Sequence, residues 1–245
     1  MQTTQKSKIN LENLAKEYDI WWKHLDNVKR DEKRRAQEKK VYQGILSSLG
    51  IVPGKKILDI ACGWGELLVL AKEQGLMVSG IDISPHAIKL AKKRIQDGDL
   101  KVARAEKLPY QNNSFDYIVC VGSLEHFDSP EKALSEMSRV IKPGGKIFIR
   151  VPNLYFLGHI FMAVKFGKFP SEGGQDFSER FSTKLGWKEL VEKNNLTVKG
   201  IHKYNFIFAT EKVNQLTLEF WNLFKALVPD GLSYCFDYIC VKQKK

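Results

Sequence analysis

Ile57-Leu58-Asp59-Ile60-Ala61-Cys62-Gly63-Trp64-Gly65-Glu66-Leu67-Leu68 reads as a buried strand, a glycine turn and the start of a helix. Gly63 and Gly65 permit a tight turn and let a ligand approach the backbone closely. A dinucleotide fingerprint would carry a third glycine at position 68 to help seat the pyrophosphate, and Leu68 stands there. The stretch therefore predicts a site for a nucleotide-type cofactor that lacks phosphates.

A second acid stands at the end of the next predicted strand. Asp59 lies near the end of strand 56–60, and Asp82 closes strand 77–82. The carboxyl ends of neighbouring parallel strands meet at one edge of a sheet, where a terminal carboxylate can accept two hydrogen bonds from the hydroxyl pair of a ribose. The two acids together suit a cationic adenosine cofactor.

Strands and helices alternate along the chain. Strands are predicted at 56–60, 77–82, 100–103, 115–121, 146–151, 196–204 and 234–241. Helices are predicted at 65–74 and near 184–194, and two more begin at Ser84-Pro85 and Ser129-Pro130, where serine suits the N-cap and proline the first helical position. This alternation indicates an α/β protein with a Rossmann-like, doubly wound and mostly parallel seven-stranded sheet.

The regions on either side of this repeat are helical or rich in aromatic residues. Apolar residues recur every third or fourth place through 11–28 and again through 41–49, which predicts a two-helix cap that ends at Gly50 and Pro53. We expect one domain over 1–245, with the cap in 1–50, the cofactor-binding core in 51–152 and two aromatic-rich insertions on the substrate side, 153–182 and 206–230.

The chain is basic, with a net charge of +11 and a pI near 9.4. Such a field attracts nucleic acid, anionic lipid or an acidic substrate. The charges are spread along the chain, and the densest cluster, Lys29 to Lys40, is interleaved with Asp31, Glu32 and Glu38. We interpret that cluster as a solvated helix face, with a partner-binding patch as the alternative.

The four cysteines lie in apolar, strand-like runs and form no C-x-x-C pair: Cys62, Cys120, Cys235 and Cys240. They are expected to be buried, reduced residues. The polar amino terminus resembles no signal peptide, and no apolar run reaches the roughly 18 residues needed to span a bilayer. A cytoplasmic protein is expected, with peripheral membrane contact left open.

Six stretches, arriving in order between residues 40 and 152, resemble a class I S-adenosylmethionine-dependent methyltransferase of the type 11, ubiquinone-biosynthesis-like group. They are Asp59 to Gly65, Asp82, Ala105-Glu106-Lys107-Leu108-Pro109-Tyr110, Phe115-Asp116-Tyr117, Leu124-Glu125-His126 and Lys142-Pro143-Gly144-Gly145. The resemblance implies S-adenosyl-L-methionine as cofactor and methyl transfer as the reaction. Its main requirement is to align a nucleophile with the methyl group and to exclude water.

The resemblance also assigns cofactor-binding positions. Backbone around Ala61, Gly63 and Gly65 would approach the methionine part, and Asp59 would balance its ammonium group. Asp82 would bind the ribose, with Ile83 and the backbone of Ala105 and Glu106 at the adenine and Val121 near the sulfur. Most relatives carry glycine where Ala61 stands, so its methyl fits if the backbone angles there are negative. Arg104 stands where an acid is frequent.

Glu125 and His126 are the predicted catalytic residues. Gly122-Ser123-Leu124-Glu125-His126 is similar to the Glu-x-x-Glu-His stretch with which ubiquinone-pathway O-methyltransferases hold a divalent metal. Glycine replaces the first carboxylate here, and one acid with one imidazole makes a poor Mg²⁺ site, so no metal is predicted. His126 can serve as a general base. A histidine that merely caps the following loop is the alternative, and His159 and Asp176 are further candidates.

Several functions stay open. The first is O-methylation of an apolar or ring-bearing small molecule, enclosed by Tyr18, Trp21, Trp22 and the two insertions. In a variant, the acceptor is a membrane-held quinone or lipid, and Phe156 to Phe169 lie at the interface with Lys165 and Lys168. Nucleic-acid methylation is less favoured, because Cys120-Val121-Gly122-Ser123 replaces the Asn- or Asp-Pro-Pro-aromatic stretch that clasps a flipped base. A non-catalytic, cofactor-binding protein is the last alternative.

Overall fold

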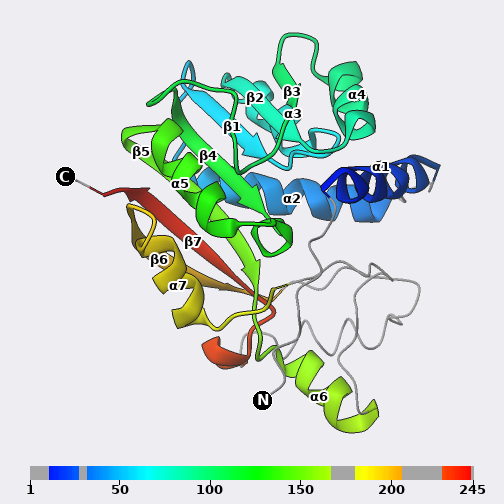
Figure 1. The fold of residues 1–245 in the computed structure, drawn as a ribbon, viewed down its shortest axis with the longest axis vertical. Coiled ribbons are helices and arrows are strands. Elements are labelled where there is room, and N and C mark those ends of the chain that lie inside the picture. The colour runs from blue at the N-terminus through cyan, green and yellow to red at the C-terminus, as the bar shows by residue number, and fades with distance from the viewer. Residues whose placement is uncertain (1–10, 28–31, 167–179, 206–227, 244–245) are drawn as a thin grey trace.

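A seven-stranded sheet forms the centre of the protein in a computed structural model that describes residues 11–27, 32–166, 180–205 and 228–243 (Figure 1). Its strands are β1 (Lys56–Ile60), β2 (Met77–Asp82), β3 (Asp99–Val102), β4 (Phe115–Val121), β5 (Ile141–Pro152), β6 (Leu196–Tyr204) and β7 (Cys235–Lys242), in the order β3-β2-β1-β4-β5-β7-β6. The strands β1 to β5 pair in parallel, and β7 runs antiparallel to β5 and β6. The predicted mostly parallel, seven-stranded sheet is confirmed.

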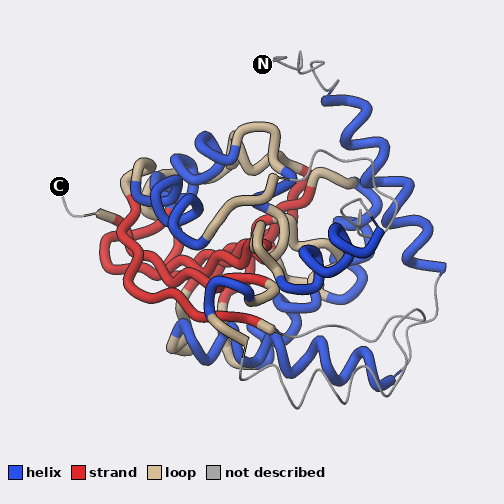
Figure 2. The backbone as a smooth tube through the Cα atoms, turned by 90° about the horizontal axis from the view of Figure 1, so that it is seen from below, coloured by secondary structure: helices blue, strands red, loops and turns tan. Residues whose placement is uncertain are grey.

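Helices cover both faces of this sheet (Figure 2). They are α1 (Leu11–Asn27), α2 (Glu32–Leu49), α3 (Glu66–Glu73), α4 (Pro85–Arg94), α5 (Pro130–Val140), α6 (Leu157–Phe166) and α7 (Lys184–Glu192), with short 3₁₀ helices η1 (Leu124–His126) and η3 (Asp230–Leu232). No helix in the described ranges is long and apolar enough to cross a membrane.

Strand alternation divides the apolar core into two clusters. Ile57 of β1 packs with residues of α2, α3 and α4, whereas its neighbours Leu58 and Ile60 pack with residues of α5 and α7. Successive side chains of a strand point to opposite faces, so a strand buried on both faces must be apolar at almost every position. This arrangement explains why Asp59, on β1, stands out in the sequence.

The predicted helix starts are confirmed. Ser84 accepts a hydrogen bond from the Ala87 amide through its side chain, and Ser129 does the same for Lys132, each with proline in the first turn. A serine oxygen at the N-cap satisfies one of the amide groups that the first helical turn leaves without a partner. The two α-helical crossings therefore begin at defined points beside the carboxyl ends of β2 and β4.

The strand β5 is longer than the predicted 146–151. It begins at Ile141, which pairs with Phe115, and the register then shifts so that Lys146 pairs with Tyr117. Gly144, with a φ of 78°, lies in the extra length between these pairs. An irregularity of this kind lets a proline–glycine stretch leave the regular ladder while pairing continues on both sides.

The two amino-terminal helices differ in how they pack. Ile45, Leu46 and Leu49 of α2 are buried in the same cluster as α3, so the second half of α2 belongs to the core. The helix α1 instead docks on α4, where Asp19 accepts 2.9 Å hydrogen bonds from the Ser84 hydroxyl and the His86 amide. The Asp19 carboxylate therefore supplements the N-cap of α4 from another helix.

Candidate active site

A cavity of 420 Å³ opens at the carboxyl ends of β1, β2 and β4, the edge at which open α/β sheets bind ligands. We call it the glycine-turn cavity. Most of the predicted site residues line it: Asp59, Ala61, Gly63, Asp82, Ile83, Ala105, Glu106, Val121 and His126. Gly65 and Glu125 do not.

The Asp82 carboxylate connects the two strand ends that form the floor of this cavity. One of its oxygens accepts a 2.9 Å hydrogen bond from the Gly63 amide, and the other accepts a 2.9 Å bond from the Ser84 amide. The glycine turn after β1 and the start of α4 after β2 are thus held by one side chain. Each carboxylate oxygen keeps a further lone pair that can accept a hydrogen bond from a ligand.

Two acids share this floor, and both are buried. Burial raises the pKa of Asp59 well above its ordinary value, and the negative charge of Asp82 raises it further. Burial also raises the pKa of Asp82, although the amides of Ser84 and Gly63 partly oppose that shift. Two desolvated carboxylates at one edge favour a ligand that brings positive charge and hydrogen-bond donors.

The two glycines of the turn have different tasks. Gly63 has a φ of 53°, and a Cβ there would collide with the Trp22 ring. Gly65 has a φ of 81° and faces α4, where a Cβ would lie 2.7 Å from Ile95 Cδ1. Gly63 therefore lets the Trp22 ring approach the turn closely, whereas Gly65 permits close packing of α3 against α4.

Ala61 does not meet the condition under which its methyl was expected to fit. Its φ is 60°, in the left-handed region, where an alanine costs roughly 1–2 kcal/mol. The following amide, that of Cys62, donates a 2.9 Å hydrogen bond to the Ile81 carbonyl, which holds the turn against the end of β2. The methyl is accommodated with some backbone strain, at a place where most relatives were expected to carry glycine.

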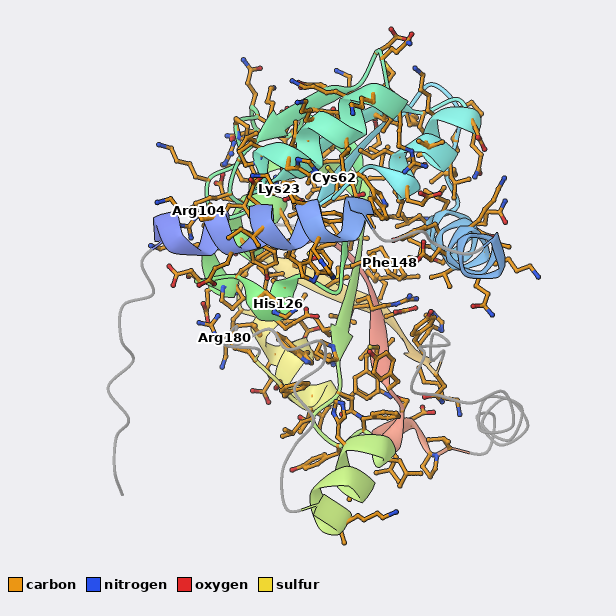
Figure 3. All side chains as sticks on the ribbon, turned by 90° about the vertical axis from the view of Figure 1, so that its right-hand side faces the viewer. Lys23, Cys62, Arg104, His126, Phe148 and Arg180 are labelled. Atoms are coloured by element: carbon orange, nitrogen blue, oxygen red, sulfur yellow. The ribbon has the colours of Figure 1, made fainter. Side chains whose placement is uncertain are left out.

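Aromatic side chains of α1 lie over the glycine turn. Tyr18, Trp21 and Trp22 line the cavity, and the Trp22 ring meets the Trp64 ring edge to face at a centroid distance of 5.2 Å. Figure 3 looks at the molecule from the side of α1, with Cys62 beyond the helix on one side and His126 on the other. These three residues, predicted to enclose the acceptor, thus line the cavity in which the cofactor was expected.

The residues expected at an adenine lie at another wall of the cavity. Ile83, Ala105 and Glu106 line it together with Arg104. Glu106 accepts hydrogen bonds from the Arg104 guanidinium at 3.2 and 3.3 Å and from the Ser129 amide at 3.4 Å. Arg104, which replaces the expected acid, thus presents donors to this wall and is held by the neighbouring glutamate.

A second cavity, of 250 Å³, adjoins the first at the carboxyl end of β5, and we call it the β5 cavity. Five residues line both cavities: Glu38, Tyr42, Val121, Gly122 and His126. Its other walls are aromatic or titratable and include Glu125, Arg150, His159, Phe181, Tyr204 and Tyr234. The predicted catalytic pair is therefore split, because His126 reaches both cavities and Glu125 only the second.

His126 stands at the junction of the two cavities. Its Nδ1 is enclosed, and the structure gives this atom no hydrogen-bond partner among the described residues. Burial lowers the pKa of His126 below its ordinary value, which keeps the imidazole neutral at physiological pH. A neutral imidazole with an unoccupied nitrogen can accept a proton or a hydrogen bond from a ligand.

A buried ion pair closes the far side of the β5 cavity. Arg150 Nε and Nη2 bond the two carboxylate oxygens of Asp237 at 2.6 and 2.7 Å, and these residues face each other on β5 and β7. The Arg150 guanidinium also lies over the Tyr204 ring, 3.4 Å from its centroid. This pair places a neutralised cation, held in a fixed orientation, beside the cavity.

The first insertion contributes less exposed apolar surface than predicted. Phe156, expected at a membrane interface, is buried and packs edge to face on His159 and Tyr234, at centroid distances of 5.1 and 5.0 Å. His159 is buried and lines the β5 cavity. Asp176, Lys168 and Phe169 lie outside the described residues, as do the aromatics predicted for 206–227.

Glu38 was assigned to a solvated helix face, and that assignment is wrong for this residue. Its relative exposure is 8%, and it lines both cavities. The reason is its place on α2, four residues before Tyr42 and seven before Ile45, which puts it on the buried face of the helix. That spacing was available in the sequence, but the surrounding charges obscured it.

Other polar features of the site have no local signature. Arg180 and the Arg150–Asp237 pair depend on residues far apart in the chain. The four cysteines are buried, as predicted. Across the described parts of the chain, no three His, Cys, Asp or Glu side chains gather as they would to bind a metal ion.

Residues 58–149, from β1 to β5, match the sequence family described as "Methyltransferase domain". A demethylmenaquinone methyltransferase from Renibacterium salmoninarum is 38% identical over 105 residues, a match that spans 43% of this chain and 44% of that one. A ubiquinone biosynthesis O-methyltransferase from Coxiella burnetii is 28% identical over 82% of this chain and 89% of its own.

Solved structures share the fold at low sequence identity. Geranyl diphosphate C-methyltransferase from Streptomyces coelicolor, solved with S-adenosyl-L-homocysteine, has a TM-score of 0.61 at 15% identity, over 84% of this chain and 79% of its own. A Haloferax volcanii protein solved with a methyltransferase activator has a TM-score of 0.66 at 17% identity, over 93% and 98%. The family match over residues 58–149, the named relatives and the sheet order together support an S-adenosylmethionine-dependent methyltransferase.

Proposed function

We propose that this enzyme methylates an oxygen of a small, ring-bearing acceptor that binds in the β5 cavity. The observation that carries the proposal is the junction of the two cavities at Val121, Gly122 and His126. An acceptor in the second cavity would meet a cofactor in the first at the one histidine that borders both. The aromatic walls contributed by Tyr42, Phe181, Tyr204 and Tyr234 suit a ring.

The charge of the glycine-turn cavity suits S-adenosylmethionine. In the proposed assignment, Asp59 balances the ammonium group, the backbone at Ala61 and Gly63 borders the methionine part, and Asp82 binds the ribose. All four residues line the cavity, and Asp59 and Asp82 support the assignment further because their burial favours a cationic ligand. When bound, S-adenosylmethionine supplies a methyl group on a sulfonium, which needs no further activation.

His126 is the proposed general base. An acceptor hydroxyl that donates a hydrogen bond to the imidazole would be oriented by that bond and would lose its proton to His126 as the oxygen becomes nucleophilic. Trp22 and Tyr18 of α1, together with the aromatics of the β5 cavity, would exclude water from the reacting groups. Glu125 borders the acceptor side only, where it would orient the acceptor.

The names of the relatives support a quinone-related acceptor. The Renibacterium protein is named a demethylmenaquinone methyltransferase and the Coxiella protein a ubiquinone biosynthesis O-methyltransferase. The chain lacks a carboxylate at Gly122, so the proposed reaction relies on a base and on positioning. Nucleic acid remains the less favoured acceptor, because Cys120 to Ser123 offers no clasp for a flipped base.

A membrane-held acceptor is the second candidate, and exposed apolar residues around α6 favour it. Tyr155, Leu157 and Val164 are 52%, 40% and 82% exposed, and Lys165 is exposed beside them. In Figure 1, α6 lies at the end of the molecule opposite β2 and β3. An apolar patch flanked by lysine suits the surface of an anionic bilayer.

Replacing Asp82 by alanine is expected to weaken binding of S-adenosylhomocysteine by about 1.5–3 kcal/mol, the scale of hydrogen bonds to a charged group. Isothermal titration calorimetry of the purified variant measures the loss. Asp97→Ala is the matched control, because Asp97 is exposed and forms an ion pair with Lys72, away from the cavity. Unchanged affinity in Asp82→Ala, with the protein folded, would count against the ribose assignment.

Asp59→Asn is expected to stabilise the cofactor-free protein at neutral pH. Because the pKa of Asp59 is raised in the folded protein, the folded state binds this proton more tightly than the unfolded chain does. The resulting contribution to the free energy of unfolding is present at acid pH and is lost as the pH rises from the ordinary pKa of the carboxyl to the raised one. Asparagine carries no charge at any pH and removes this loss, which raises Tm by about 2–4 °C per kcal/mol. Thermal melts from pH 4 to 8, with and without S-adenosylhomocysteine, should show the gain only without ligand.

His126→Gln is expected to lower methyl transfer by roughly 10²–10⁴-fold while leaving S-adenosylhomocysteine affinity unchanged. The acceptor is first found by label transfer from methyl-labelled cofactor to a metabolite extract. Since burial lowers the pKa of His126, wild-type activity should persist below pH 6.5 before it declines. The exposed His202, changed to glutamine, serves as control; equal turnover in both variants would remove His126 from the base role.

Val164→Asp is expected to reduce binding to phosphatidylcholine–phosphatidylglycerol vesicles by roughly tenfold, because it replaces an apolar contact of about 1.5 kcal/mol with a charge. Flotation of the full chain with the vesicles measures binding. Leu185→Asp is the control, since Leu185 is 66% exposed but lies on α7. If wild type fails to float, or both variants float alike, the acceptor is taken from solution.

A further inference from the structure

The short loop that carries His126 is held from outside by one arginine. Arg180 Nη1 donates a 2.9 Å hydrogen bond to the Phe127 carbonyl, and Nη2 donates a 2.8 Å bond to the Asp128 carbonyl. The Arg180 amide donates a third bond, of 3.1 Å, to the Glu125 carbonyl. These three carbonyls belong to the residue before His126 and to the two residues after it.

The loop needs such donors. The helix η1 spans Leu124–His126 only, and Phe127 then turns to an extended conformation with a ψ of 143°. Phe127 and Asp128 lie beyond the last residue of η1, so their carbonyls have no partner within the helix, and one planar guanidinium can serve both. Within the loop itself, the His126 amide donates a 3.0 Å hydrogen bond to the Ser123 carbonyl, and the Phe127 amide donates a longer one, of 3.4 Å, to the Leu124 carbonyl. Local bonds therefore hold amides of the loop, whereas Arg180 holds the carbonyls of Glu125, Phe127 and Asp128.

Arg180 begins a segment that also forms the acceptor-side wall. Phe181 lines the β5 cavity and meets the His159 ring edge to face at 5.7 Å. Ser182 pairs with Asn153, and its carbonyl accepts a 3.1 Å hydrogen bond from the Leu154 amide just beyond β5. Three consecutive residues thus contact the His126 loop, the acceptor cavity and the end of the sheet.

We infer that Arg180 is a positioning residue, which holds the His126 loop against the acceptor-side segment so that the imidazole stays at the junction of the two cavities. This inference rests on the proposed function, because that function makes the junction the place of methyl transfer. The hydrogen bonds of Arg180 do not depend on it. Phe181 follows Arg180 in the chain and lines the β5 cavity. An acceptor in contact with the Phe181 ring would therefore also contact the segment that holds the His126 loop. Figure 3 shows Arg180 below His126, on the side away from Cys62.

Lysine cannot replace this arginine fully. A single ammonium is a point donor on a flexible stem, whereas the two carbonyls of Phe127 and Asp128 are met by two nitrogens of one rigid plane. The expected order of loop protection is therefore wild type, then Arg180→Lys, then Arg180→Ala. Free guanidinium, which has the same plane of donors, should restore Arg180→Ala in part.

Hydrogen exchange of the full chain tests the contact directly. In Arg180→Ala, the amides of residues 125–128 should exchange about tenfold faster than in wild type, while those of β1 and β4 stay unchanged. Guanidinium chloride, far below unfolding concentrations, should restore protection. Arg139→Ala is the matched control, because its guanidinium also bonds backbone carbonyls, those of Leu108 and Tyr110, in another loop.

The His126 imidazole, followed by NMR titration, reports the position of the side chain itself. Titratable or charged groups around it are Glu38 on α2, Arg104 and Glu106 before β4, Glu125 and Asp128 beside η1, Arg150 on β5 and His159 on α6. Wild type should titrate below the ordinary range because of burial, and Arg180→Ala should shift upward as the loop opens. Guanidinium should reverse the shift.

Two results would overturn the inference: unchanged exchange and titration in Arg180→Ala, or the same changes in Arg139→Ala. If Arg180→Ala does not fold, Arg180→Lys carries the test, with smaller changes of the same sign. The outcome is separable from that of the proposed function. Full turnover in His126→Gln would contradict the base role of His126 and leave the Arg180 result standing. Lost turnover in His126→Gln with unchanged exchange and titration in Arg180→Ala would support the base and contradict the positioning role of Arg180.

Discussion

The Asp82 carboxylate ties together the glycine turn after β1, the end of β2 and the start of α4, through its bonds to the amides of Gly63 and Ser84. The helix α1 reaches the same point, because Asp19 bonds the Ser84 hydroxyl and the His86 amide. The shape of the glycine-turn cavity therefore depends on one buried anion. A neutral side chain of the same size would accept one of these bonds and lose the other.

Placing that anion beside Asp59 has an energetic consequence. Burial raises the pKa of both carboxyls, and the charge of Asp82 adds to the shift at Asp59, so the empty cavity is electrostatically unfavourable at neutral pH. A ligand with an ammonium, a sulfonium and hydroxyl donors offsets this cost by supplying the missing positive charge and hydrogen bonds. The burial and mutual repulsion of the two carboxylates, which lower the stability of the free protein, thus contribute to selection of the cofactor.

The sheet and the residues that line the glycine-turn cavity could be predicted because their signals are local. The run from Ile57 to Gly63 shows strand, acid and turn within a few residues, and the Ser84-Pro85 pair marks a helix start by itself. The acceptor side could not be predicted in the same way. Arg180 and Arg150 act on partners about 50 and 87 residues away in the chain, and no periodicity encodes such pairs. Glu38 was missed for another reason, since neighbouring charges concealed its helical spacing.

The two cavities also differ in how the chain builds them. The proposed cofactor side is built from β1, β2 and the turns that follow them, and both strands are paired on either side within the sheet. The proposed acceptor side is assembled at the end of β5 from separate segments, α2, η1 and residues 180–182, and Arg180 bonds to the carbonyls just after η1. Substitutions in those segments can alter the acceptor without disturbing the pairing that forms the cofactor floor. A chain that keeps the first set of contacts and changes the second would therefore keep methyl transfer and change its substrate.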